Sequence, residues 1–255
     1  MSVRLLASDL DGTLVGHDSA LRRLNTALAD RREAWKLAYV TGRTLSSALE
    51  LLASTELLQP DVLVSGVGTE IHWGTELRPD PHWPSQFQAD WHVARVRSIA
   101  ATFAALIPQP ESCQSEWKCS YFLDTASAPF VMQELQKVLT DSGMLVKLIY
   151  SSGRDLDIIP FAAGKGQAVR WVAEQLGVTL DQVVACGDSG NDLEMLQLAG
   201  YPVVVGHAQP ELLRQAPASA YRAQAPCADG ILEALVHFGH LPAGLDSSRV
   251  ASSWS

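Results

Sequence analysis

The 255-residue sequence has little of several features that mark particular function classes. Lys and Arg together number 19 against 28 Asp and Glu, which gives a formal net charge of −9. Binding to nucleic acid or to an anionic membrane without regard to sequence needs a basic surface. No apolar run approaches the roughly 18 residues that a membrane-spanning helix requires. We therefore expect no nucleic-acid partner and no membrane partner.

Cysteines are also few, and their spacing is not that of a metal site. Cys113, Cys119, Cys186 and Cys227 form no CxxC pair and no Cys/His cluster with zinc spacing. The N-terminal segment becomes acidic at Asp9, too early for the apolar region of a secretory signal peptide. These observations predict a cytoplasmic protein with reduced thiols and no disulfide. We also expect a monomer.

The composition that remains, 47% hydrophobic and 18% charged, is that of a globular protein of one to two domains. Short apolar runs alternate with helical patterns at both ends of the chain. The predicted strands are 3–8, 37–40, 62–67, 183–186 and 201–205, and the predicted helices are 21–32, 44–53, 166–176, 193–200 and 230–238. Gly200 is expected to cap the C-terminus of its helix. This alternation predicts an α/β fold with a doubly wound, Rossmann-like parallel sheet.

The middle of the chain has a different pattern. Residues 74–92 are rich in proline and tryptophan, which indicates a boundary between domains. The elements predicted after it are helix 93–106, strand 118–123, helix 128–142 and strands 145–150 and 155–159, the last two forming a hairpin. We therefore predict an inserted α+β cap. The predicted boundaries are a core of 1–79 and 161–244, a cap of 80–160 and a flexible tail of 245–255.

Asp9 and Asp11 follow the first predicted strand, in the segment DLDGT at 9–13. Open α/β sheets bind ligands beyond the carboxyl ends of their strands. Residues two apart project to the same side, so both carboxylates are expected to face one site. A carboxylate there could ligate Mg²⁺ or attack an electrophile. The alternative is that Asp and Gly simply form a turn, and the pair alone does not decide between the two.

The segment GDSGND at 187–192 also follows a buried strand. Asp188, Asn191 and Asp192 crowd together there, and their oxygens would repel one another without a cation. Capping of the following helix would explain one or two of these side chains but not all three. The cluster therefore favours a metal site with oxygen ligands.

Two further segments are typical of anion binding. Thr41, Gly42 and Arg43 lie between a predicted strand and a helix, where a hydroxyl and free N–H groups can hold an anion. Lys165 stands at a helix start, where the helix dipole disfavours a cation, which suggests an anionic partner. It is not a Walker A lysine, because Gly166 follows it in place of Ser or Thr. Taken singly, a helix cap and a surface lysine would explain these residues equally well.

The four motifs together predict more than any one of them. Carboxylates with Mg²⁺ on one side, and a hydroxyl with a lysine on the other, are what phosphoryl transfer through an aspartyl-phosphate requires. In this order the motifs resemble those of the haloacid dehalogenase superfamily of phosphatases. The resemblance implies that Asp9 is the nucleophile, that Asp11 is the general acid and base, and that Thr41 and Lys165 hold the phosphoryl oxygens. It also implies a Mg²⁺ site formed by Asp9, Asp11 (through its backbone carbonyl), Asp188 and Asp192, with Asn191 in support.

Further segments resemble the sucrose-phosphate phosphatase family of photosynthetic cells. They are 30–32, 37–39, 68–71, 117–121, 151–157 and 208–213, and one departure is His207, where the family pattern leads us to expect Asn. The resemblance implies a Mg²⁺-dependent phosphatase that hydrolyses sucrose 6-phosphate in the final step of sucrose biosynthesis. Two alternatives stay open. The substrate could be another sugar phosphate, such as mannosyl-3-phosphoglycerate or glucosylglycerol phosphate, or the protein could be a non-catalytic partner of sucrose-phosphate synthase.

The residues expected to bind the sugar come partly from the cap. Lys118 and Tyr121 lie on one predicted strand but on opposite faces, so they need not both reach the substrate. Glu70 follows the third predicted strand and is interpreted as an acceptor for sugar hydroxyls. Most tryptophans are expected to pack in the core or the linker. The full set of expected substrate-binding residues is Thr41, Gly42, Arg43, Glu70, Lys118, Tyr121, Lys165 and Asn191.

Overall fold

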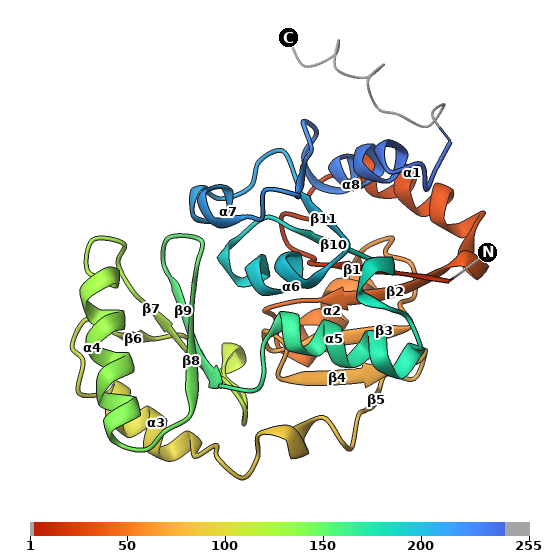
Figure 1. The fold of residues 1–255 in the computed structure, drawn as a ribbon. Helices are drawn as coiled ribbons and strands as arrows, with labels where there is room; N and C mark the ends of the chain where they lie inside the picture. The colour runs from red at the N-terminus through yellow and green to blue at the C-terminus, as the bar shows by residue number, and fades with distance from the viewer. Residues whose placement is uncertain (1–2, 243–255) are drawn as a thin grey trace.

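The computed structural model describes residues 3–242, which form a larger and a smaller lobe (Figure 1). The larger lobe holds an eight-stranded sheet in the order β12-β11-β10-β1-β2-β3-β4-β5. Its strands are β1 Arg4–Ser8, β2 Trp35–Val40, β3 Val62–Ser65, β4 Glu70–Trp73, β5 Arg78–Pro79, β10 Val183–Gly187, β11 Tyr201–Val204 and β12 Tyr221–Arg222. The strands from β12 to β3 are parallel, and β4 and β5 extend the sheet as antiparallel strands.

Helices cover both faces of this sheet, which confirms the doubly wound prediction. They are α1 Asp18–Ala29, α2 Leu45–Ser54, α5 Lys165–Leu176, α6 Leu193–Leu198, α7 Pro210–Gln215 and α8 Cys227–His237. Successive residues of a strand point to opposite faces. Accordingly, Leu5 and Ala7 pack with α5 and α6, whereas Leu6 packs with α1 and α8. The continuous apolar strands of the sequence are therefore strands buried on both sides.

The smaller lobe is the inserted segment, an antiparallel sheet in the order β6-β7-β9-β8. Its elements are α3 Val93–Ala100, β6 Ile107–Pro108, β7 Cys119–Phe122, α4 Ala128–Asp141, β8 Val146–Ser151 and β9 Asp155–Pro160. The strands β8 and β9 form the expected hairpin. Ser152 and Gly153 have φ values of +54° and +66°, which close its turn. A separate hydrophobic core fills the space between this sheet and its two helices.

Several short elements of the structure were not predicted from the sequence. Within the part of the chain that the structure describes, single-turn 3₁₀ helices occur at Arg32–Ala34, Pro84–Gln86, Glu111–Cys113, Leu180–Gln182 and Gly190–Asp192. The strands β4, β5, β6 and β12 and the helix α7 were also not predicted, because two to six residues are too few to show a period. The helix expected over 93–106 ends earlier, at Ala100. The predicted tail of 245–255 lies outside the described residues.

Gly200 does not have the role that its position suggested. The helix α6 ends at Leu198, Ala199 is extended, and Gly200 does not have a positive φ. A Cβ at position 200 would lie 2.6 Å from the Cα of Asp181. The prediction of a C-cap is therefore wrong, and glycine is needed here because two backbone segments come close together.

The segment that leads into the cap packs on the core. The Asp80 carboxylate accepts hydrogen bonds from the indole N–H groups of Trp73 (2.8 Å) and Trp171 (2.9 Å). Trp83 and Phe87 join the core cluster on the α5 face of the sheet. We therefore propose that the cap begins after Phe87 rather than at residue 80.

The sequence predicted that no helix spans a membrane and that the cysteines are reduced. Within residues 3–242, no helix combines the length and the apolar character needed to span a bilayer. The four cysteines, all in this described part, are free thiols.

Candidate active site

The predicted motifs meet at the carboxyl edge of the parallel strands. Asp9 follows β1, Thr41 follows β2, and Asp188 follows β10, while Lys165 is the first residue of α5. The strands β10, β1 and β2 are neighbours in the sheet, so their carboxyl ends lie side by side (Figure 1). This edge is where open α/β sheets hold their ligands.

Lys165 is fully buried at the centre of this group. Its Nζ lies 2.7 Å from Oδ1 of Asp9 and 2.6 Å from Oδ1 of Asp192. Burial by itself would lower the pKa of Lys165, but the charges of Asp192 and Asp9 outweigh that effect and raise it. The alternative of an exposed surface lysine is wrong, because the side chain is 0% exposed.

A close backbone contact fixes the start of α5. Gly68 has a φ of +89°, and a Cβ there would lie 2.2 Å from the carbonyl carbon of Gly164. Only glycine permits this approach at this φ. The loop after β3 thereby supports the residue that precedes Lys165.

Three carboxylates surround the lysine. Asp9, Asp188 and Asp192 are buried, and each offers a carboxylate oxygen within 4.8 Å of the others. Burial raises the pKa of Asp9 well above its ordinary value, with Asp192 and Asp188 adding to the effect against the opposing charge of Lys165. Burial and the charge of Asp192 raise the pKa of Asp188 to about 6. Three carboxylates beside one ammonium group suit a divalent cation with oxygen ligands, so the residues present fit Mg²⁺.

Asp192 is the most fully engaged of the three. Its Oδ2 accepts the N–H groups of Asp188 (3.0 Å) and Ser189 (3.1 Å), while its Oδ1 binds Lys165. A Cβ at Gly187 would lie 2.4 Å from the Cβ of Asp192, so glycine is required before this turn. The capping alternative is therefore correct for Asp192, which holds the turn that presents Asp188.

Asp188 also contacts the segment after β1. Its Oδ1 accepts a hydrogen bond from the Thr13 hydroxyl at 3.0 Å. Gly12 has a φ of +74°, and a Cβ there would lie 2.8 Å from Oδ2 of Asp188. Gly12 and Thr13 thus position the Asp188 carboxylate.

The Asp11 side chain lies outside the buried group of Asp9, Asp188 and Asp192, although it lines the same cavity as Asp9. The strand ends at Ser8, and the Leu10 carbonyl accepts the N–H groups of Leu14 and Val15 in a tight turn. The alternation of a strand therefore no longer applies at position 11. The Asp11 carboxylate instead binds Arg43, whose Nε and Nη2 each lie 2.7 Å from one of its oxygens.

Thr41, Gly42 and Asn191 are placed at the same edge. Thr41 is fully buried, and its hydroxyl accepts the backbone N–H of Arg43 at 3.1 Å. The helix cap is Thr44 rather than Thr41, so the capping alternative fails for Thr41. Gly42 and Asn191 line the cavity described next.

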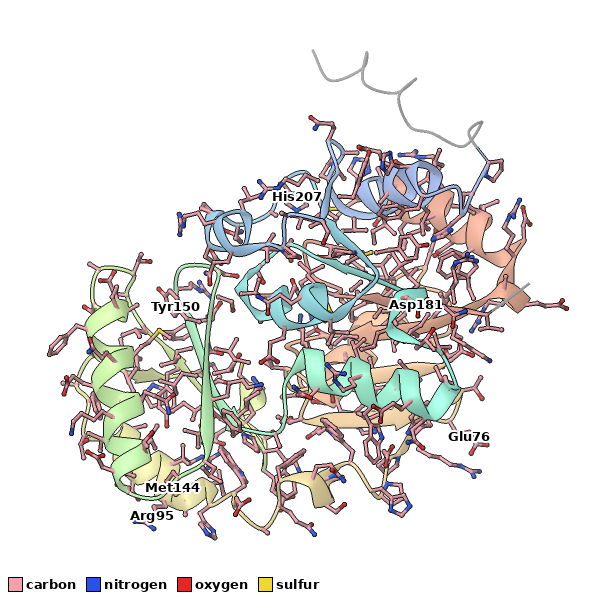
Figure 2. The ribbon with its side chains drawn as sticks, viewed as in Figure 1. Glu76, Arg95, Met144, Tyr150, Asp181 and His207 are labelled. Atoms are coloured by element: carbon pink, nitrogen blue, oxygen red, sulfur yellow. The ribbon has the colours of Figure 1, made fainter. Side chains whose placement is uncertain are left out.

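A cavity of about 450 Å³ lies between the core and the cap. Asp9, Asp11, Arg43 and Asp188 are among the residues that line it from the core. From the cap it is lined by Gln109, Ser112, Cys113, Lys118, Ser151, Ser152, Arg154, Asp155 and Asp157. Figure 2 labels Tyr150 on the cap hairpin beside the core. A Cβ at Gly190 would lie 2.7 Å from the carbonyl oxygen of Tyr150. The cap hairpin thus reaches the GDSGND turn.

The polar cap residues form two small networks. The buried Lys118 has its Nζ 2.6 Å from the Ser120 hydroxyl and 3.2 Å from Oδ1 of Asp157. Oδ1 of Asp155 accepts the side-chain amide of Gln109 at 2.9 Å and Nε of Arg154 at 3.3 Å. Among the cap residues that line the cavity, only Lys118 was predicted from the sequence as a substrate contact. The spacing of two between Asp155 and Asp157 is a signal that could have placed both on one face of a strand.

Two expected sugar contacts are not in this cavity. Tyr121 is 5% exposed and packs in the hydrophobic core of the cap, because it points to the opposite face of β7 from the Ser120 network. Glu70 accepts the Ser65 hydroxyl at 2.8 Å and lines a different cavity with Trp117. The His72 imidazole, 3.8 Å away, and the Ser65 hydroxyl hold the pKa of Glu70 below its ordinary value. The structure thus does not bring Tyr121 or Glu70 together with the other site residues.

Comparison with known proteins decides the family. Residues 2–239 match the family model described as sucrose-6F-phosphate phosphohydrolase. The chain belongs to this family. Its fold is the haloacid dehalogenase fold, as the motifs predicted.

The chain is also similar to three named proteins. A probable sucrose-phosphatase 2 of Arabidopsis thaliana is 36% identical over 92% of this chain and 59% of its own length. A mannosylfructose-phosphate phosphatase of Agrobacterium fabrum is 35% identical over 94% of this chain and 98% of its own. The solved structure of a sucrose-phosphatase from Synechocystis, in complex with sucrose and phosphate, is 40% identical with a TM-score of 0.88 over 94% of this chain and 99% of that one. The chain thus spans about three fifths of the plant relative and nearly all of the two bacterial proteins.

Proposed function

We propose that this protein is a Mg²⁺-dependent phosphatase that hydrolyses sucrose 6-phosphate to sucrose and phosphate through an aspartyl-phosphate. The observation that carries the proposal is the Asp9 carboxylate, which Lys165 orients beside two further carboxylates at the floor of a cavity covered by the cap. The substrate is inferred from the plant relatives and from the Synechocystis protein solved with sucrose and phosphate.

The metal would be held by Asp9 and Asp188. Asp192 would support it indirectly, because both of its oxygens already accept hydrogen bonds. The backbone carbonyl of Asp11 is a further ligand that the family resemblance implies. When bound, Mg²⁺ would neutralise charge on the phosphoryl group and lower the repulsion between that group and an anionic nucleophile.

Asp9 would act as the nucleophile. Lys165 binds Oδ1 of Asp9, which leaves Oδ2 to attack phosphorus. The bond from phosphorus to the sugar oxygen breaks, and that oxygen takes a proton from Asp11. Water then attacks the aspartyl-phosphate and loses its proton to Asp11, which releases phosphate and restores both carboxyl groups. Thr41 and Lys165 would hold the phosphoryl oxygens during both steps.

The sugar would be bound by the polar cap residues. Lys118, Gln109 and Asp157 line the cavity opposite Asp9 and offer both donors and acceptors to hydroxyl groups. A cavity of about 450 Å³ lies in the range of small-molecule sites. We further propose that the protein acts in the cytoplasm at the final step of sucrose biosynthesis. Its monomeric state and its association with sucrose-phosphate synthase stay predictions.

A screen of phosphate release tests the substrate. It compares sucrose 6-phosphate, mannosylfructose phosphate, mannosyl-3-phosphoglycerate and glucosylglycerol phosphate by kcat/KM, with Mg²⁺ present. We expect the highest value for sucrose 6-phosphate. Mannosylfructose phosphate is the second candidate, because the Agrobacterium relative matches this chain over nearly its whole length. A higher value for any other sugar phosphate would reassign the substrate, and no release from all four, with capture of the synthase in a pull-down, would favour a non-catalytic partner.

A further inference from the structure

Arg43 and Asp11 form a bidentate ion pair in the lining of the cavity. Nε of Arg43 lies 2.7 Å from Oδ2 of Asp11, and Nη2 lies 2.7 Å from Oδ1. Two parallel bonds of this kind are the strong, bidentate form of an arginine–carboxylate contact. Both residues line the cavity, and the Asp11 side chain is 52% exposed. The pair is therefore accessible to a ligand that enters.

Electrostatics explains why Asp11 rests on Arg43 rather than beside Asp9. The buried group already places the carboxylates of Asp9, Asp188 and Asp192 around the ammonium group of Lys165. A fourth carboxylate would add repulsion in a region shielded from water. At the rim, Arg43 offers two N–H groups that match a carboxylate.

The position of Arg43 is fixed by the phosphate-binding turn. Its backbone N–H donates to the Thr41 hydroxyl, and its carbonyl accepts the N–H of Gly66 at 2.7 Å. Its remaining nitrogen, Nη1, donates to Ser47 at 2.9 Å. The next residue, Thr44, donates from its hydroxyl to the carbonyl of Ser112 in the cap at 3.1 Å. Arg43 thus lies where the expected phosphate site, the expected acid and the cap come together.

We propose that Arg43 is a positioning residue that holds Asp11 at the rim of the cavity and releases it when the phosphoryl group of a substrate takes its place on the guanidinium. This inference rests on the proposed function, which makes Asp11 the general acid. A carboxylate that accepts two charge-assisted hydrogen bonds has no proton to donate to a leaving oxygen, so Asp11 has to leave Arg43 and take up a proton from water before it acts. A phosphoryl group presents the same planar pair of acceptors that Asp11 presents. The exchange forms and breaks only hydrogen bonds, and it couples the arrival of an anionic substrate to the release of the acid.

Structures of the whole protein with and without a phosphoryl mimic test the exchange directly. The probe is beryllium fluoride with Mg²⁺, a mimic of a phosphoryl group on an aspartate. We expect the mimic on Asp9, contacts from Arg43 to its fluorines, and Asp11 separated from Arg43 beyond hydrogen-bond distance. A mimic on Asp9 with the Arg43–Asp11 pair intact overturns the inference and leaves the proposed function standing. A protein that does not take the mimic on Asp9 overturns the nucleophile, and this inference with it.

Kinetics of Arg43 variants in the native protein and in an Asp11→Asn protein tests whether Arg43 positions Asp11 or only binds substrate. We expect Arg43→Gln to raise KM, because the guanidinium no longer binds the phosphoryl group, and to lower kcat on the order of tenfold, because Asp11 is no longer kept beside the cavity until the substrate arrives. Arg43→Lys, which can still hold one oxygen, should recover most of kcat. In an Asp11→Asn background, Arg43→Gln should still raise KM but should leave kcat unchanged, because the coupled partner is already lost.

The opposite pattern would overturn the proposal. If Arg43 only binds substrate, Arg43→Gln would raise KM by the same factor in the native and the Asp11→Asn protein. In each case kcat would equal that of the parent protein. Arg22→Gln is the matched control, because Arg22 is an exposed arginine that pairs with Glu56 away from the cavity. It removes the same charge and should change neither KM nor kcat.

Discussion

The two sides of the cavity are built in different ways. On the core side, Asp9, Lys165 and Asp192 are buried, and their charges contact one another directly. On the cap side the Lys118–Asp157 pair is also buried, but Gln109, Arg154 and Asp155 are linked by hydrogen bonds that are partly exposed to solvent. The charged groups of the core side are held in place by their direct contacts. The solvent-exposed hydrogen bonds of the cap side can instead be exchanged for hydrogen bonds to the hydroxyl groups of a ligand. This contrast supports our proposal that the core side performs the chemistry and the cap side selects the substrate.

The largest expected effect is the loss of the nucleophile on the core side. Asp9→Asn should lower kcat by on the order of 10⁴-fold or more, because an amide oxygen does not form the aspartyl-phosphate. The amide can still accept a hydrogen bond from Lys165, so the fold should persist. Phosphate release measures the first point and circular dichroism the second. Near-normal turnover by the folded variant would remove Asp9 from its role.

Removal of the metal should abolish phosphate release, because the expected metal ligands lie on the core side and none lies in the cap. EDTA should reduce phosphate release to background, and added Mg²⁺ should restore it. Binding can also be followed without turnover, because a ligand that binds the folded state raises Tm. We expect Mg²⁺ to raise Tm of the native protein and to have a much smaller effect on Asp188→Asn. An equal rise in both proteins would show that Asp188 does not hold the metal.

Neutralising Lys165 tests whether the buried charges act as a unit. Lys165→Met leaves Asp9 and Asp192 without their counter-charge, so it should destabilise the fold by about 3 kcal/mol as well as abolish activity. Thermal unfolding at pH 7 measures the first effect. Lys137→Met is the matched control, since Lys137 is an exposed lysine that pairs with Asp141 on α4. Equal values of Tm for the two variants would contradict the electrostatic account of the core.

The smallest effect is expected on the cap side, and it should depend on the substrate. Lys118→Ala should lower kcat/KM for sucrose 6-phosphate about tenfold, because one charged hydrogen-bond donor is lost. The same change should leave the hydrolysis of p-nitrophenyl phosphate unaffected, since this substrate has no sugar to bind. Tyr121→Phe should change neither value, because Tyr121 packs inside the cap. Equal losses with both substrates would place Lys118 in the chemistry instead.

The sequence was most informative where topology alone brings residues together. Asp9, Thr41 and Asp188 follow strands that neighbour one another, so their meeting follows from the order of the sheet. The contacts between side chains could not be derived in this way. The position of Asp11 depends on a tight turn and on a partner 32 residues away, and neither has a local signal. Glu70 lies at the sheet edge as predicted, but it lines a second cavity with Trp117, and the sequence carries no signal for that contact with the cap.

Gly68 has one further consequence, for how this family can change. Its carbonyl accepts the Trp83 indole N–H on the segment that leaves for the cap, and its Cα approaches Gly164 on the segment that returns. The segment that leads into the insert and the segment that leaves it therefore both contact a single residue of the core. What lies between them can be lengthened, repacked or exchanged while Lys165, one residue beyond the returning end, stays where it is. The same chemistry could thus be offered to new sugars by replacing one continuous stretch of the chain.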